Sequence, residues 1–182
     1  PKPGGRYVDC TLGAGGHSRG ILEASSPDGE LLAFDLDADA IAIAAQTLKP
    51  FGSRVHLRHD SYLNILSAMK VLEWESVDGI VLDYGVSSMQ LDRPERGFSF
   101  RLDGPLDMRF DKTQGISAAA YLNQVEEEQL ANVLWKYGEE SRSRRIAAAI
   151  TANRPIETTQ KLAQIIKDAI GRPEKRGRKT IH

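Results

Sequence analysis

The 182-residue chain has a single cysteine, Cys10, and no apolar run near the roughly 20 residues that a membrane-spanning helix needs. One cysteine excludes an internal disulfide and a cluster of thiolate metal ligands. Of the four histidines, His56 and His59 stand three apart in a predicted strand, so their side chains point to opposite faces and no metal site is expected. Hydrophobic residues at 41% and charged residues at 27% are typical of a globular protein, and no membrane partner is expected.

The chain also lacks an excess of charge of either sign, since its formal net charge is −1. As a whole it is therefore not a polyanion-binding tail. The exception is the stretch 172–179, where five basic residues accompany one acid, Glu174. This stretch is a candidate phosphate contact, although charge alone favours a solvated chain end.

Residues 6–83 alternate between short apolar runs and helical patterns. The apolar runs predict strands at residues 7–10, 31–34, 55–59 and 77–83. Helical spacing predicts helices at residues 17–24, 38–48 and 63–71. The second and fourth runs are continuous, as in strands buried on both faces. The alternation is typical of an α/β fold with a parallel sheet and right-handed crossovers.

From residue 103 onward the pattern is helical. Helices are predicted at residues 117–122, 126–137, 142–152 and 159–170. In the second of these, Leu130 and Tyr137 fall on one apolar face, and Asn123 followed by Glu126 resembles a capping box. Gly104-Pro105 breaks any regular element, so the chain is predicted to divide into residues 1–103 and 104–182.

The sharpest local signal is a glycine-rich loop at residues 9–17, DCTLGAGGH, between a predicted strand and a predicted helix. Its glycines, Gly13, Gly15 and Gly16, let the backbone turn tightly and approach a ligand. Asp9 stands where hydride-transferring Rossmann domains carry an apolar residue, and a carboxylate suits a cationic amino-acid moiety better than a pyrophosphate. Ser18 replaces the third glycine of the dinucleotide fingerprint. The loop therefore predicts a nucleotide-like ligand and favours S-adenosylmethionine as the cofactor.

Two further aspartates stand at predicted strand ends. Asp35 has the spacing from the glycine loop of an acid that binds a ribose diol. Capping of the next helix is the alternative for Asp35, but Asp37 and Asp39 are better placed for it. Because the carboxyl ends of parallel strands share one edge of a sheet, we expect Asp35, Asp83 and Asp9 to form one site.

The chain resembles the bacterial-type ribosomal RNA small-subunit methyltransferases that modify the exocyclic N4 of a cytidine, the MraW family. The resemblance covers nearly the whole chain, in the motifs YVDCTLGAGGH (7–17), AFDLD (33–37), DYGVSSMQLD (83–92), RGFSF (96–100), DGPLDMR (103–109) and YGEE (137–140). It implies a Rossmann-like class I S-adenosylmethionine-dependent methyltransferase sheet with an inserted all-helical subdomain. Residues 1–103 would then be a partial methyltransferase domain and 104–182 an insert that helps hold RNA.

The resemblance also implies roles for single residues. Together with the loop analysis, the expected donor-binding residues are Asp9, Gly13, Gly15, Gly16, His17, Asp35, Tyr62, Asp83 and Gln90. Tyr62 is implied to lie near the adenine, and Asp83 and Gln90 at the methionine end. From the residues alone, Tyr62 is a half-buried core aromatic, and Gln90 has no assigned role.

Basic side chains are the expected RNA contacts. The candidates are Arg142, Arg144, Arg145, Arg176, Arg178 and Lys179. The alternative, for each arginine considered alone, is a solvated helix residue with no RNA contact. The family has a further N-terminal segment and returns to complete its sheet, so we expect this chain to be a fragment. The expected partner is small-subunit ribosomal RNA or the small subunit, in the cytoplasm or in an organelle matrix or stroma, and a homodimer stays open.

Catalysis is expected to rest on positioning, since a sulfonium methyl group is a good electrophile. Asp83 is the candidate catalytic residue, as the acceptor for the proton of the cytosine N4 amine, with pure donor binding as an equal alternative. Residues 87–101 are the expected wall of the pocket for the target base. Other functions stay open: a nicotinamide-dependent oxidoreductase, a non-catalytic donor- or RNA-binding fragment, and a DNA or protein methyltransferase.

Overall fold

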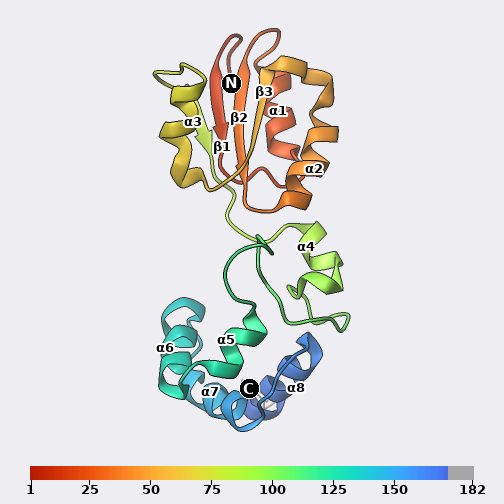
Figure 1. Ribbon diagram of the computed structural model, residues 1–182, viewed down its shortest axis with the longest axis vertical. Helices are drawn as coiled ribbons and strands as arrows, with labels where there is room; N and C mark the ends of the chain where they lie inside the picture. The colour runs from red at the N-terminus through yellow and green to blue at the C-terminus, as the bar shows by residue number, and fades with distance from the viewer. Residues whose placement is uncertain (172–182) are drawn as a thin grey trace, which may run out of the picture. The chain divides into compact units, whose positions relative to one another are not determined.

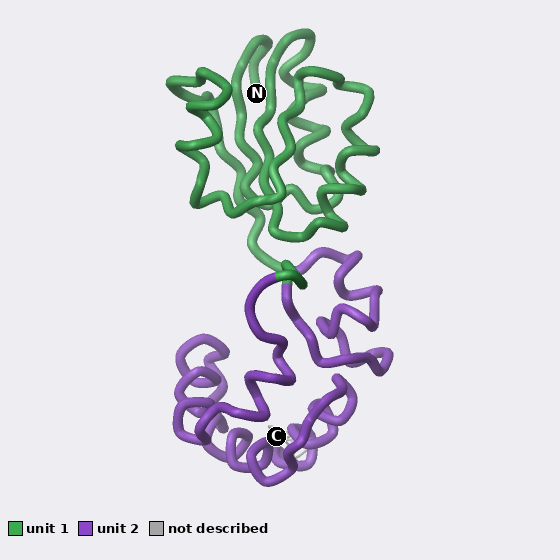
Figure 2. The backbone as a smooth tube through the Cα atoms, in the orientation of Figure 1, with its two compact units in different colours: residues 1–85, 110–113 green, residues 86–109, 114–182 purple. Residues whose placement is uncertain are grey.

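The computed structural model describes residues 1–171, which fold as two compact units (Figure 2). The first unit consists of residues 1–85 and 110–113. The second consists of residues 86–109 and, within the described part of the chain, residues 114–171.

The first unit is built on a parallel four-stranded sheet (Figure 1). Its strands are β1 (Arg6–Asp9), β2 (Glu30–Asp35), β3 (Val55–His59) and β4 (Gly79–Val81), in the spatial order β3-β2-β1-β4. Val8 of β1 lies opposite Leu32 of β2 on one side and Ile80 of β4 on the other. The parallel arrangement and the first three predicted strands are confirmed.

Helices cover both faces of this sheet (Figure 1). They are α1 (Gly16–Ala24), α2 (Ala38–Thr47) and α3 (Ile65–Val71), with the 3₁₀ turns η1 (Lys49–Arg54) and η2 (Tyr62–Asn64). Leu31 and Ala33 of β2 pack with residues of α1 and α2, whereas Leu32 and Phe34 pack with residues of α3. Successive side chains of a strand point to opposite faces, so β2 is buried on both, as its continuous apolar sequence predicts.

Strand β4 differs from its prediction. A strand buried on both faces was expected over residues 77–83, but β4 is confined to Gly79–Val81, and Ile80 and Leu82 are 51% and 41% exposed. Among the described residues, β4 pairs with β1 alone and lies at the edge of the sheet. Its apolar sequence is that of a central strand, whereas its burial is that of an edge strand.

The second unit is helical. Its elements are α4 (Ser88–Asp92), the 3₁₀ turn η3 (Pro94–Arg96), α5 (Ala118–Gln124), α6 (Glu127–Gly138), α7 (Ser143–Ala152) and α8 (Thr159–Ile170). The last four confirm the helices predicted from apolar spacing, and α8 has the predicted bounds. None of the helices in residues 1–171 is both long and apolar enough to cross a membrane.

The core of the second unit lies among α5, α6, α7 and α8, with Leu130, Ile146 and Ile150 at its centre. The predicted capping box is wrong, because Asn123 lies inside α5 and the N-cap of α6, Glu126, makes no side-chain capping bond. The Asn123 amide instead donates to the carbonyl of Ile156 at 2.9 Å and accepts from its N–H at 2.8 Å.

Tyr137 also departs from its prediction as part of the apolar face of α6. It lies in the last turn of that helix, where the face runs past the core, and its side chain is 74% exposed.

The segment before residue 104 is hydrogen-bonded to the start of α8 through its last two residues. The Gln160 N–H donates to Asp103 Oδ1 at 3.1 Å, and the Thr159 hydroxyl donates to the carbonyl of Leu102 at 3.4 Å. The boundary at 103/104 and the insertion of the helical part stay predictions. The structure adds that the segment before this boundary is bonded to α8.

Ile150 is 2% exposed, so Ile150→Ala should lower the free energy of unfolding by about 2–4 kcal/mol through the cavity that the lost carbons leave. Urea unfolding followed by far-UV circular dichroism measures this change. The control is Ile116→Ala, the same substitution at a side chain that is 62% exposed, which should change the value by about 0.5 kcal/mol or less. Equal losses at both positions would contradict the assignment of Ile150 to the core.

Candidate functional site

The carboxyl ends of the strands meet at one edge of the sheet, where the chain changes direction between β1 and β4. From β1 the chain moves to β2 and β3 on one side and then returns to β4 on the other. In open α/β sheets, ligands bind in the crevice at such a switch point. Asp9 and Asp35 are the last residues of β1 and β2, and Asp83 follows β4. The three acids therefore lie at the same edge, as expected.

The glycine loop that follows β1 has one buried glycine and two open ones. Gly15 has φ +85°, and a Cβ there would lie 3.3 Å from Leu48 Cγ and 3.4 Å from Ala44 Cβ. A side chain at Gly15 would therefore strain the backbone and press on α2. At Gly13 and Gly16 an added Cβ would meet nothing within 4 Å. The loop thus packs at Gly15 and leaves its backbone accessible at Gly13 and Gly16.

Asp9 is 1% exposed, and both of its carboxylate oxygens are hydrogen-bonded inside the unit. The buried Ser18 hydroxyl donates to Oδ2 at 2.7 Å, and the Thr11 N–H donates to Oδ1 at 3.0 Å. Burial raises the pKa of Asp9, against the lowering effect of these two hydrogen bonds. In the sequence, Ser18 stands out only as the residue that replaces the third glycine of the dinucleotide fingerprint, and its bond to Asp9 was not predicted. A direct contact of Asp9 with the donor stays a prediction.

Asp35 connects the end of β2 to the glycine loop. Its Oδ2 accepts the Gly13 N–H at 2.8 Å, and its Oδ1 accepts the Asp37 N–H at 2.9 Å. The next helix, α2, is capped by Asp37, which accepts the Asp39 N–H at 3.0 Å, as predicted. Asp35 is half-buried, and each carboxylate oxygen has a second lone pair. It therefore remains able to accept hydrogen bonds from ligand hydroxyls.

His17 and Asp83 face each other across the switch point. His17 Nδ1 lies 3.8 Å from Asp83 Oδ2, and the two side chains are 61% and 67% exposed. So exposed a pair contributes little to stability, and both groups are accessible to a ligand. The main-chain N–H of Asp83 donates to the Thr11 hydroxyl at 2.7 Å.

Two tyrosines lie near this edge in the first unit. Tyr62, the first residue of η2, is half-buried and packs against the core that contains Phe34, as the residues alone predicted. Its ring centroid is 6.5 Å from that of Tyr84, which is 71% exposed. The neighbouring Tyr62 side chain raises the pKa of Tyr84. Tyr84 was not among the predicted site residues, although its place beside Asp83 was a signal. An adenine contact of Tyr62 stays a prediction.

Gln90 belongs to the second unit and is 3% exposed. It forms a capping box with Ser87 at the start of α4. The Ser87 N–H donates to Gln90 Oε1 at 3.0 Å, and the Gln90 N–H donates to Ser87 Oγ at 3.2 Å. Its side chain thus has a structural role, and a contact with the methionine end of a donor stays a prediction.

The candidate RNA contacts differ in their surroundings. The Arg142 guanidinium donates to the carbonyl of Ile170 at 3.2 Å, at the end of α8. Arg144 and Arg145 are exposed residues of α7. Three other candidates lie outside the described residues: Arg176, Arg178 and Lys179.

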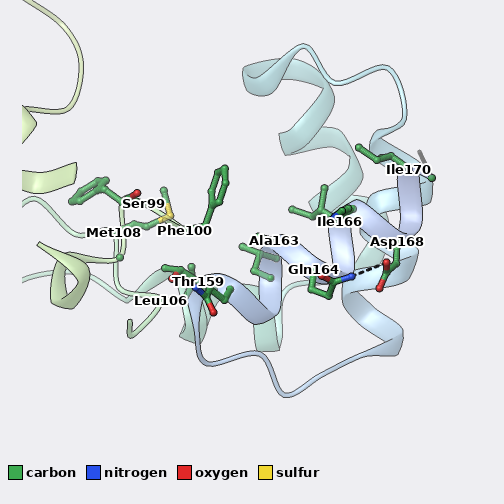
Figure 3. A pocket seen from close by; sticks show the side chains of 16 residues that line it. Ser99, Phe100, Leu106, Met108, Thr159, Ala163, Gln164, Ile166, Asp168 and Ile170 are labelled. Carbon is green, nitrogen blue, oxygen red and sulfur yellow. Dashed lines mark hydrogen bonds between the residues drawn. The ribbon is translucent and has the colours of Figure 1, made fainter. Parts of the chain in front are cut away.

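The second unit contains a groove of about 1060 Å³ between residues 97–108 and α8 (Figure 3). Phe100 and Met108 line it opposite Ala163 and Ile166 of α8. Gln164 of α8 also lines the groove, and its amide donates to Asp168 Oδ1 at 2.8 Å. Residues 97–100 belong to the expected wall of the base pocket. The groove itself was not predicted, because its two sides are far apart in the sequence.

The parallel sheet, its helices on both faces and the glycine loop at its switch point are those of a Rossmann-like S-adenosylmethionine-dependent methyltransferase fold. The sequence profile of the MraW methylase family matches residues 1–182. The chain belongs to this family, as its motifs predicted.

Relatives at about 50% identity carry one name, ribosomal RNA small subunit methyltransferase H. The protein of this name from Dehalococcoides mccartyi is 54% identical over 169 residues, which are 93% of this chain and 48% of that protein. The one from Geotalea uraniireducens is 50% identical over 175 residues, 94% of this chain and 56% of that protein. The chain spans about half the length of the curated relatives it matches.

Asp9→Ala should lower the free energy of unfolding by about 1–3 kcal/mol, because it leaves the Thr11 N–H and the Ser18 hydroxyl without their acceptor. Asp9→Asn is the matched variant, since it keeps the shape of the side chain and removes the buried charge. Since the pKa of folded Asp9 is raised, the native state binds its proton more tightly than the unfolded chain. The wild type should therefore gain stability relative to Asp9→Asn as the pH falls from neutral toward 4. Urea unfolding at several pH values measures this difference, and a loss of relative stability on acidification would contradict it.

Proposed function

We propose that the complete protein transfers a methyl group from S-adenosylmethionine to the exocyclic N4 of a cytidine in small-subunit ribosomal RNA. The observation that carries the proposal is the glycine loop at the switch point, open at Gly13 and Gly16 and tied to Asp35. The family and the names of the relatives support ribosomal RNA as the substrate. The choice of cytidine N4 as the methylated atom rests on the motif resemblance. Such a substrate places the protein where ribosomes are assembled, in a cytoplasm or an organelle.

The residues of the switch point fit a donor made of an adenosine and an amino acid. The accessible backbone at Gly13 and Gly16 leaves room for the ligand at the start of α1. Asp35 has spare lone pairs for the ribose hydroxyls, and Tyr62 would lie at the adenine. His17 and Asp83 would lie at the amino-acid end. When bound there, S-adenosylmethionine would supply an electrophilic methyl group on a positively charged sulfur.

Asp83 is the acid that would act on the acceptor. The lone pair of a cytosine N4 amine is delocalised into the ring, so the amine is a poor nucleophile. It must lose a proton when its nitrogen gains the methyl group, and the Asp83 carboxylate is an exposed acceptor at the reactive edge. Donor binding alone remains the competing role for Asp83.

Exposed arginines of the second unit would contact the RNA backbone. Arg144 and Arg145 are exposed on α7 and can form charge-assisted hydrogen bonds with phosphates. Arg142 contributes less to this role, since its guanidinium already holds the end of α8. The basic side chains of Arg176, Arg178 and Lys179, which lie outside the described residues, would add further positive charge for phosphate binding.

Gly16→Ala should separate donor binding from stability. An alanine Cβ at Gly16 meets nothing in the folded chain, so thermal stability should not fall. The Cβ would fill donor space and weaken affinity by about tenfold or more. Isothermal calorimetry with S-adenosylmethionine measures this. Gly15→Ala is the matched control and should lower stability by about 1–2 kcal/mol through its positive φ and its contact with Leu48. Wild-type affinity in Gly16→Ala would contradict this placement of the donor.

Asp83→Ala should lower methyl transfer to RNA by about a hundredfold or more, through loss of the proton acceptor. The assay offers small ribosomal subunits, DNA and protein together to the complete protein with a labelled methyl donor. Asp28→Ala serves as the control, because Asp28 is an exposed aspartate just before β2, at the opposite edge of the sheet.

The distribution of the label tests the proposal itself. Label in DNA or protein instead of RNA would contradict the acceptor. Bound donor without any transfer would indicate a binding protein, and oxidation of a reduced nicotinamide would indicate an oxidoreductase.

A further inference from the structure

We propose that Thr11 is a positioning residue, whose hydroxyl fixes the main chain of Asp83 at the switch point. The inference rests on the proposed function, since it concerns what holds the acid that this function uses. The observation behind it is the 2.7 Å hydrogen bond from the Asp83 N–H to Thr11 Oγ1, which joins two residues 72 positions apart in the sequence.

The bond replaces a backbone hydrogen bond that regular pairing of β1 with β4 would form at this point. Strands β1 and β4 pair in parallel with Asp9 opposite Val81, and the Cys10 N–H donates to the Val81 carbonyl at 2.9 Å. In a parallel ladder, the next bond would run from the Asp83 N–H to the carbonyl of Cys10. The structure instead gives that N–H the hydroxyl of Thr11. A side chain thus extends the ladder where backbone pairing has ended.

The backbone of the loop cannot do this itself, because after Cys10 it follows the other neighbour, β2. The Leu12 N–H donates to the carbonyl of Phe34 at 3.0 Å, and the Gly13 N–H donates to Asp35 Oδ2 at 2.8 Å. The chain is thereby drawn toward β2 and into the turn before α1. The Thr11 side chain spans the opening that this leaves on the β4 side.

Asp83 depends on its main chain for its position. Strand β4 ends at Val81, and residues 82–84 have no regular structure. The Asp83 side chain is 67% exposed, and its approach to His17, at 3.8 Å, is longer than a hydrogen bond. A displacement of about 1 Å in a reacting group can cost about a hundredfold in rate. A hydrogen bond that holds the Asp83 amide therefore also restricts the position of its carboxylate.

Thr11 is itself held in place. Its N–H donates to Asp9 Oδ1 at 3.0 Å, and the other oxygen of Asp9 accepts from Ser18 at 2.7 Å. A β-branched side chain also has few χ1 rotamers, so its hydroxyl direction is well defined. Ser18 of α1, Asp9 of β1, Thr11 and Asp83 thus form one continuous set of hydrogen bonds. It joins the donor loop to the acid on the acceptor side.

The test compares Thr11→Val, which keeps the shape and loses the acceptor, with Thr11→Ser, which keeps the hydroxyl. Amide hydrogen exchange by NMR should show the Asp83 amide exchanging about threefold to tenfold faster in Thr11→Val and near the wild-type rate in Thr11→Ser. The Cys10 amide, bonded to Val81 in the same ladder, should keep its rate and so exclude global unfolding. In the complete protein, Thr11→Val should lower kcat for methyl transfer about tenfold, with a smaller change in KM for RNA, and Thr11→Ser should restore it.

Equal exchange of the Asp83 amide in all three proteins would overturn the proposal. So would full kcat in Thr11→Val, or a Thr11→Ser variant as impaired as Thr11→Val, which would indicate packing instead of the hydroxyl. A wild type that transfers no methyl group would contradict the proposed function, while the exchange rates would still decide whether Thr11 holds Asp83.

Discussion

A buried carboxylate at the end of the central strand is the constraint around which the first unit is built. Removing the charge of Asp9 from water costs free energy, and its two hydrogen bonds only partly offset this, since its pKa remains raised. The donors come from different elements: Ser18 from α1 and Thr11 from the loop. Satisfying one carboxylate therefore fixes the start of the helix relative to the end of the strand. The loop between them is held at both ends, which leaves Gly13 and Gly16 accessible in a defined geometry.

The strand order imposes a second constraint on the same place. Strand β1 lies between β2 and β4, and the chain beyond it can follow only one of them. The bonds of Leu12 and Gly13 show that it follows β2. Separation from β4 is thus a consequence of topology, and the crevice at the strand ends needs no special sequence to open. What the sequence must supply is a side chain that spans the crevice, and a hydroxyl is the smallest group that can accept a backbone hydrogen bond there.

The sequence predicts an element well where burial follows from local composition. Strand β2 is buried on both faces, so its run of apolar residues is enough to predict a central strand. Helix α8 has a clear amphipathic pattern that ends at Gly171, so its bounds are predictable as well. Strand β4 has the same kind of run as β2, but its neighbours decide its exposure, and Ile80 cannot reveal how many strands flank it. The Asn123 pattern fails for a related reason: its partner is Ile156, 33 residues away, and local spacing points to a cap instead.

The candidate site shows the same division within a single motif. Strand-end position was enough to predict that Asp35 and Asp83 lie at one edge, because a parallel sheet brings its carboxyl ends together whatever the details. The direction in which each loop side chain faces was not predictable. Asp9 turns inward to Ser18, whereas His17 turns outward to Asp83, although both belong to one glycine-rich stretch. A loop that binds a ligand with backbone atoms must first be rigid, so part of its sequence serves the fold and only the rest can serve the ligand. A motif of this kind therefore specifies the site as a whole, and the roles of its residues follow only from the register of β1 against β2 and β4.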